Sequence, residues 1–172
     1  LGCPNLEFPG GGPGVLAWAV RGYGAWQQPL FDGSLPAVAV RTSVTSEPAE
    51  LVLCESVESG HSAHDWSGLT AGELAVRKTP LRMDSQCKYL AVASGEADVY
   101  LRLPTKKGYQ EKIWDHAAGA LVASEAGCTV TDSRGVPMDF STGRRLTAAQ
   151  GVICAPPRLH AALVDALAPL VG

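Results

Sequence analysis

The sequence predicts an α/β fold, in which short strands alternate with helices along one chain of 172 residues. Two observations support this prediction. Short runs rich in Val, Leu and Ala end repeatedly at Gly or Pro, which is typical of strands. Between them lie longer apolar segments whose spacing and end residues are typical of helices. The length suits a single domain, and the sequence contains no internal repeats.

The first half of the chain predicts strands separated by turns. Residues 10–14 form a glycine-rich connector, and Gly22 and Gly24 mark the turn between the first two strands. The strands are expected within 15–26, where there are two, and then at 36–41 and 51–56. Residues 61–74 are polar and mixed, which indicates a loop that runs into a helix.

The next segment predicts a strand, a helix and another strand. The first strand is expected at 81–83. Asp84 and Ser85 are favourable N-cap residues for a helix over 86–95, which ends at Gly95. Residues 97–104 alternate as a buried strand does, and Pro104 ends that pattern.

The clearest helix is expected at 111–128, with Gly127 as its C-cap. Its predicted apolar side comprises Trp114, Ala118, Leu121 and Val122. Short strands are expected at 129–132 and 151–155. A last helix begins at the proline pair 156–157 and runs through 159–170, with an interruption or end near Pro169.

Composition excludes several classes of partner. The formal net charge of −3 argues against non-specific binding to nucleic-acid polymers or to membranes. No segment approaches the roughly 20 apolar residues that span a bilayer. The five cysteines form no CxxC pair, which favours free thiols in a reducing intracellular compartment, either the cytoplasm or an organelle such as the chloroplast or mitochondrion.

Positive charge gathers in the middle of the chain. Eight of the fourteen basic residues lie between positions 77 and 112, against four acidic residues. One interpretation is a solvated face. The other is a local cradle for a compact anion such as phosphate.

Asp115 lies at the start of the helix expected at 111–128 and also has two interpretations. It suits the first turn of a helix, where backbone N–H groups favour negative charge. It also suits Mg²⁺, which takes one or two protein carboxylates together with phosphate and water oxygens. Gly119 nearby costs about 1 kcal/mol in a helix interior, which implies a packing or functional reason for it.

The segment 114-WDHAAGALVASEAG-127 resembles a signature of the inositol monophosphatase family, which comprises Mg²⁺-dependent, lithium-sensitive phosphatases. The segments 60–65, 83–104, 109–116 and 138–146 resemble one branch of it, the 3′(2′),5′-bisphosphate nucleotidases. These enzymes remove the 3′-phosphate of 3′-phosphoadenosine 5′-phosphate (adenosine 3′,5′-bisphosphate) and leave AMP. The resemblance implies the layered αβαβα sugar-phosphatase fold, a mixed sheet flanked by helices.

The resemblance also implies roles for particular residues. Asp115 matches the aspartate that completes the metal site, and it is the expected catalytic and metal-binding residue, also in contact with substrate. The positions that match nucleotide-binding residues are His61, Ser85, Lys88 and Arg102. Simpler interpretations remain open: Arg102 as a surface arginine, Asp84 as a helix cap, and Lys106 and Lys107 as a solvated turn.

The resemblance covers only the C-terminal lobe of the family fold. The upstream Glu and the Asp-Pro-x-Asp-Gly-Thr motif that supply the other metal ligands do not occur in residues 1–172. We therefore expect the two or three Mg²⁺ ions of the complete enzyme to need an N-terminal half or another protein chain. The alternatives are a catalytically silent lobe that serves as a structural or interaction subunit, and an activity like that of inositol polyphosphate 1-phosphatase.

One position departs from the family pattern. The family has a second glycine after Glu-Ala-Gly, where this chain has Cys128. A positive φ at this position would strain a cysteine by about 1 kcal/mol, whereas an ordinary φ would make the change harmless.

Overall fold

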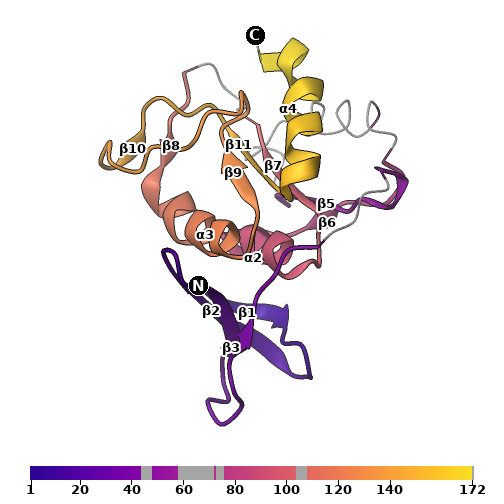
Figure 1. Ribbon diagram of the computed structural model, residues 1–172, viewed down its shortest axis with the longest axis vertical. Helices are drawn as coiled ribbons and strands as arrows, with labels where there is room; N and C mark the ends of the chain where they lie inside the picture. Colours follow the sequence, from indigo (N-terminus) through magenta and orange to yellow (C-terminus); the bar gives the residue numbers. More distant parts are fainter. Residues whose placement is uncertain (44–47, 58–71, 73–75, 104–107, 172) are drawn as a thin grey trace.

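The computed structural model describes residues 1–43, 48–57, 72, 76–103 and 108–171 (Figure 1). Most of the loop and helix expected at 61–74 lies outside these residues, as do Pro104 and the two lysines that follow it. The described strands and helices alternate in an α/β arrangement, which confirms the predicted fold class. No helix in this part of the chain is long and apolar enough to cross a membrane.

The first sheet is antiparallel and has the order β1-β2-β3-β4. Its strands are β1 (Gly2–Glu7), β2 (Pro13–Val20), β3 (Gly24–Pro29) and β4 (Val38–Ala39). The hairpin between β2 and β3 confirms the predicted turn, with φ of 79° at Gly22 and 95° at Gly24. The strand expected at 36–41 is shorter than predicted because the chain then leaves the sheet: Thr42 N–H donates to the carbonyl of Ala126.

The second sheet is mixed and has the order β6-β5-β7-β11-β9. After the 3₁₀ turn η1 (Pro48–Glu50), its strands in chain order are β5 (Leu53–Glu55), β6 (Leu81–Arg82), β7 (Val99–Arg102), β9 (Thr129–Thr131) and β11 (Val152–Ala155). Strand β5 runs parallel to β6 and β7, whereas β11 runs antiparallel to β7 and β9. All five lie within or close to the strands expected from the sequence.

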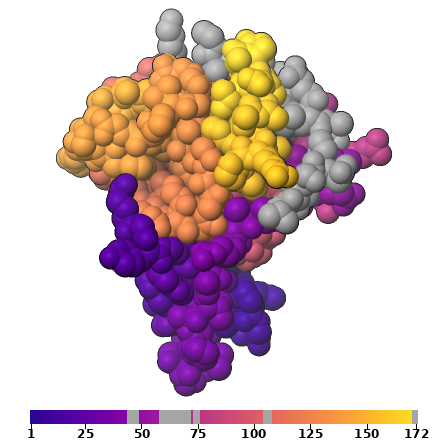
Figure 2. Space-filling view, in the orientation of Figure 1, coloured from indigo at the N-terminus to yellow at the C-terminus, as the bar shows by residue number. Residues whose placement is uncertain are grey.

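Helices cover both faces of the mixed sheet (Figure 1). Helices α2 (Cys87–Ser94) and α3 (Ile113–Glu125) lie between the two sheets, and α4 (Pro157–Val171) lies on the opposite face. Alternation along the strands produces two cores, since Tyr100 and Cys154 face α2 and α3 whereas Leu101 and Ile153 face Leu163 of α4. In the space-filling view, the indigo-to-purple N-terminal part that contains β1 to β4 lies below the rest of the molecule and is in contact with it (Figure 2).

Helix α3 ends in a Schellman motif. The N–H of Cys128 donates to the carbonyl of Ala123 at 3.0 Å, and the N–H of Gly127 donates to that of Ser124 at 3.1 Å. Gly127 has φ of 102° and follows the C-cap residue Ala126, one position from the predicted cap. Cys128 has no positive φ, so its departure from the family glycine is harmless.

The buried face of α3 differs from the prediction. Trp114 is 53% exposed and Ala118 is exposed, whereas the buried residues are His116, Gly119, Ala120, Val122 and Ala123. The spacing of apolar residues does not predict this face, because His116 is buried against polar partners and Gly119 is buried against a tyrosine ring. A short ribbon of β8 (Glu111–Lys112) and β10 (Arg145–Leu146) leads the chain into this helix.

Candidate active site

A cavity of about 500 Å³ lies where the start of α2, the end of β7 and the first turn of α3 meet. Four of the five residues predicted from the sequence to bind substrate line it, namely Ser85, Lys88, Arg102 and Asp115. They come from three separate segments of the chain, so the fold brings together what the sequence predicts to act together. The fifth, His61, lies outside the described residues.

Ser85 stands in the turn that leads into α2, and its backbone is left-handed with φ of 68°. It is the only non-glycine residue with positive φ in the described ranges. Its hydroxyl accepts a hydrogen bond from the N–H of Cys87 at 3.2 Å. A left-handed conformation costs a non-glycine residue about 1 kcal/mol, so this turn holds Ser85 at the cavity wall at a cost in stability.

The predicted cap of α2 is wrong in detail. The N-cap position is Gln86, without a side-chain cap, while Asp84 accepts a hydrogen bond from the N–H of Val57 at 3.2 Å. Gln86 instead joins the two helices: its amide nitrogen donates to the carbonyl of Trp114, and its amide oxygen accepts from the N–H of Gly119, both at 2.7 Å. This link depends on a tertiary contact that capping rules do not consider.

Lys88 presents a buried positive charge to the cavity. Its residue is only 2% exposed, its ammonium donates to the carbonyl of Met83 at 3.3 Å, and it lies 5.3 Å from the ring centre of Tyr100. Burial lowers the pKa of Lys88 below its ordinary value, an effect that the nearby Cys54 and Asp84 oppose. An anion in the cavity would therefore meet a poorly hydrated ammonium group.

Arg102 is held by Glu111. The guanidinium Nε lies 3.0 Å from one carboxylate oxygen of Glu111 and 3.2 Å from the other, and Nη2 lies 3.4 Å from the hydroxyl of Tyr109. Burial alone would lower the pKa of Arg102, but Glu111 together with Tyr100, Tyr109 and Asp115 outweighs this effect, and the pKa is raised. The Arg102 interpretation as a surface residue is wrong, because its side chain is only 14% exposed.

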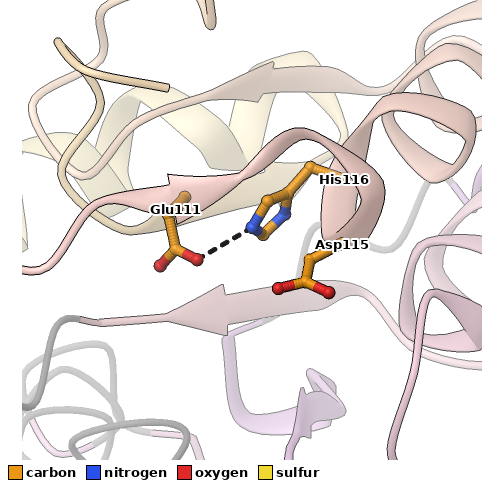
Figure 3. A group of neighbouring side chains, drawn as sticks. All are labelled: Glu111, Asp115 and His116. Carbon is orange, nitrogen blue, oxygen red and sulfur yellow. Dashed lines mark hydrogen bonds and ion pairs between the residues drawn. The ribbon is translucent and has the colours of Figure 1, made fainter. Parts of the chain in front are cut away.

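A buried hydrogen-bonded chain extends behind Glu111. Nε2 of His116 hydrogen-bonds to a carboxylate oxygen of Glu111 at 2.9 Å (Figure 3). Nδ1 of His116 lies 2.8 Å from the hydroxyl of Tyr89. Burial alone would raise the pKa of Glu111, but the hydrogen bond from His116 and the charge of Arg102 lower it. An ionised Glu111 accepts from Nε2 of His116, and in the neutral imidazole this tautomer leaves Nδ1 to accept from Tyr89.

Glu111, Asp115 and His116 lie close enough to suggest a metal site, with potential ligand atoms all within 4.8 Å of one another. Two of the three are already engaged, since Glu111 contacts Arg102 and His116 while His116 uses both ring nitrogens. Asp115 is different: its side chain is 37% exposed, and among the described residues its ion-pair distance is 3.9 Å, to Arg102. A Mg²⁺ ion therefore fits the carboxylate of Asp115 and not the group of three.

Sequence reasoning missed Glu111, His116, Tyr89 and Gln86 as parts of the site. The sequence did contain a signal, because Glu111 and His116 lie on either side of the Trp-Asp motif, within the six residues 111–116. Their partners lie on α2 and β7, so spacing along the chain could not reveal that the two side chains meet.

These features define a layered α/β protein whose cavity sets a buried lysine and a partly buried arginine beside an accessible carboxylate. A model of the inositol monophosphatase family matches residues 6–171. The chain therefore belongs to the inositol monophosphatase family, as its motifs indicated, and this family generally uses Mg²⁺.

Relatives of known name are similar along almost the whole chain. The 3′(2′),5′-bisphosphate nucleotidase of Emericella nidulans is 42% identical over 186 residues, which cover 97% of this chain and 52% of that protein. The 3′(2′),5′-bisphosphate nucleotidase of Oryza sativa is also 42% identical, over 97% of this chain and 49% of that protein. The chain thus spans about half the length of these curated relatives.

Solved structures agree on the fold. Mycobacterium tuberculosis SuhB superposes with a TM-score of 0.63 and 24% identity, over 92% of this chain and 55% of that one. An IMPase of Thermotoga maritima gives a TM-score of 0.59 and 19% identity, over 92% and 56%. At this level of identity, the likeness supports the layered architecture alone.

Proposed function

We propose that this chain forms the nucleotide-binding part of a Mg²⁺-dependent phosphatase that removes the 3′-phosphate of adenosine 3′,5′-bisphosphate and leaves AMP. The observation that carries this proposal is the convergence of Ser85, Lys88 and Arg102 with the accessible Asp115 on one cavity. The names of the relatives in Emericella nidulans and Oryza sativa support the same substrate class.

Each cavity residue has a chemical role in this proposal. Lys88 offers a point charge to a phosphate oxygen, and Arg102 offers the nitrogen atoms that Glu111 leaves free. Ser85 offers a hydroxyl group and, with His61, helps to hold the nucleotide. Asp115 would hold Mg²⁺, which when bound neutralises phosphate charge and makes water a better nucleophile.

The reaction requires more carboxylates than the described residues place at the cavity. Asp84 and Asp115 are the carboxylates that line it, and two carboxylates are too few to hold two or three Mg²⁺ ions in place against water. The proposal therefore includes a second component, either an N-terminal half or another protein chain, that brings the remaining metal ligands to the side of Asp115.

A second candidate function, an interaction subunit without turnover, is favoured by one observation. The outer face of the first sheet exposes apolar side chains, among them Trp18 and Val20, at 36% and 52%. Exposed apolar surface of this kind is typical of protein interfaces.

Phosphate release from adenosine 3′,5′-bisphosphate in the presence of Mg²⁺ tests the proposal. It should be measured for the protein that carries this chain and for Asp115→Asn, with Asp165→Asn as the control because Asp165 is an exposed carboxylate of α4. Loss of several kcal/mol of charge stabilisation should slow Asp115→Asn at least about a hundredfold. Equal rates for wild type and Asp115→Asn would contradict the proposal, and folded protein without turnover would favour the interaction subunit.

A further inference from the structure

Two carboxylates compete for one guanidinium group at the cavity. Glu111 contacts Arg102 at 3.0 Å and its side chain is 2% exposed, whereas Asp115 lies 3.9 Å away and is 37% exposed. A buried, hydrogen-bonded pair attracts more strongly than a partly exposed and longer one. Arg102 is consequently paired with Glu111, and the Asp115 carboxylate keeps its oxygens available.

The pairing depends on the orientation of Glu111, which buried groups fix. Figure 3 shows Glu111, from β8, and His116, from α3, joined by their hydrogen bond, with Asp115 outside it. His116 is in turn oriented by the hydroxyl of Tyr89 on α2, and both residues are fully buried. The groups thus connect α2, α3, β8 and β7 in one chain that ends at the guanidinium.

We propose that Glu111 is a positioning residue: backed by His116 and Tyr89, it holds Arg102 away from Asp115 and so keeps the Asp115 carboxylate free for a cation. The consequence for catalysis rests on the proposed function, whereas the geometry does not. Arg102 needs to move only about 1 Å to reach an ordinary ion-pair distance with Asp115. Among the described residues, Asp115 is the other carboxylate that lies within ion-pair distance of Arg102.

The direct test is the structure of Glu111→Gln. This substitution keeps the shape of the side chain but removes its charge, and Glu50→Gln is a matched control because Glu50 forms an exposed ion pair with Lys78. In Glu111→Gln, we expect the Arg102 Nη2 to Asp115 distance to fall from 3.9 Å to about 2.9 Å, the normal charge-assisted distance. An unchanged Arg102 position would overturn the inference.

Proton exchange of the Arg102 side chain gives a second readout in solution. Nuclear magnetic resonance should show a protected Nε–H for Arg102 in the wild type, and exchange at least about tenfold faster in Glu111→Gln, because a hydrogen bond to a charged group is lost. An equally protected Nε–H in both proteins would contradict the proposed anchoring. Both readouts remain informative if the protein releases no phosphate.

Milder variants cover the case in which Glu111→Gln fails to fold. Tyr89→Phe retains the ring and removes only the hydroxyl that orients His116, and Tyr23→Phe is the control because Tyr23 is 77% exposed. We expect Arg102 Nε–H exchange to rise by about fivefold in Tyr89→Phe, from the loss of one neutral hydrogen bond, and not in Tyr23→Phe. Equal exchange in both variants would overturn the role of the buried chain.

Mg²⁺-dependent kinetics separate this inference from the proposed function. If the protein releases phosphate, Glu111→Gln should require at least about tenfold more Mg²⁺ for half-maximal rate than the wild type, because the cation must displace Arg102 from Asp115. A lower rate with an unchanged Mg²⁺ requirement would contradict the inference and leave the proposed function standing. No turnover in the wild type would contradict only the proposed function.

Discussion

Ser85 combines a strained backbone with a place on the cavity wall. Its φ of 68° is one that glycine adopts freely, yet a serine occupies it and accepts a hydrogen bond from Cys87. Residues held in such conformations occur often at functional sites, where a side chain must stand at a particular point. The hydroxyl group of Ser85 is the part that glycine could not supply.

Comparing two substitutions of Ser85 tests this account. Both Ser85→Gly and Ser85→Ala lose the hydroxyl, but only alanine keeps the backbone strain. The free energy of unfolding of Ser85→Gly should therefore exceed that of Ser85→Ala by about 1 kcal/mol. Denaturant unfolding measures the difference. Ser85→Ala as stable as Ser85→Gly would show that the positive φ carries no cost here.

At the scale of elements, small residues set how closely α2 and α3 approach. A Cβ atom at Gly119 would lie 2.3 Å from Cδ2 of Tyr89 and 2.7 Å from its Cγ. The glycine in Ala-Ala-Gly therefore has a packing reason, since the ring that reaches His116 lies directly on the backbone of α3. The position of the Tyr89 ring thus explains both the presence of glycine inside the helix and the hydrogen bond to His116.

Gly119→Ala should destabilise the protein by about 1–3 kcal/mol through overpacking, although alanine favours a helix by about 1 kcal/mol. Thermal or denaturant unfolding checks the change, with Gly33→Ala as the control because a Cβ there meets nothing within 4 Å. A stabilised Gly119→Ala would mean that the ring moves aside freely.

Glu125 explains the second half of the family signature. Its carboxylate, at the end of α3, accepts hydrogen bonds from the N–H groups of Gly22 at 2.8 Å and Gly24 at 2.9 Å, and so fixes the β2–β3 hairpin to the helix. These two donors lower the pKa of Glu125 below its ordinary value. The anchor is therefore complete above the ordinary pKa of a glutamate and is lost as pH falls through the lowered one.

Amide hydrogen exchange should follow this titration. In the wild type, protection of the Gly22 and Gly24 amides should persist below about pH 4, the ordinary range of a glutamate, and then decline with further acidification. Glu125→Ala should remove the protection at every pH. Protection that is independent of both pH and the substitution would contradict the anchor.

At the scale of the whole molecule, the first sheet is covered on one face only. Its inner face packs against α3, while Trp18 of β2 lies opposite Trp26 of β3 on the outer face, where Val20 is 52% exposed. Apolar surface of this kind favours association with another polypeptide.

Self-association of the chain should weaken when this face carries charge. We expect Val20→Lys and Trp18→Lys to lower the apparent mass at high protein concentration in sedimentation experiments, because charge opposes burial of the face. Val136→Lys is the control, since Val136 is similarly exposed outside the first sheet. Equal association in all three variants would locate the interface elsewhere.

The sequence predicted the fold class, most strands and helices, and four residues that share the cavity. The fold class, strands and helices follow from local signals, such as glycine turns and alternation, whereas the four residues follow from the resemblance of the motifs to the family. It did not predict the exposure of Trp114 or the partners of Gln86, Glu111 and His116, because these depend on contacts between α2, α3 and β7 that no local rule contains. A buried histidine in an apolar pattern is recognisable only once its partners are known.

The central claim, that the cavity binds a nucleoside bisphosphate through Lys88 and Arg102, is tested most directly by calorimetric titration with adenosine 3′,5′-bisphosphate in the presence of Mg²⁺. We predict that Arg102→Met weakens binding at least about tenfold, as expected for the loss of a charge-assisted contact, whereas Arg158→Met on the exposed side of α4 leaves it unchanged. Equal affinity for the wild type and Arg102→Met would contradict the account.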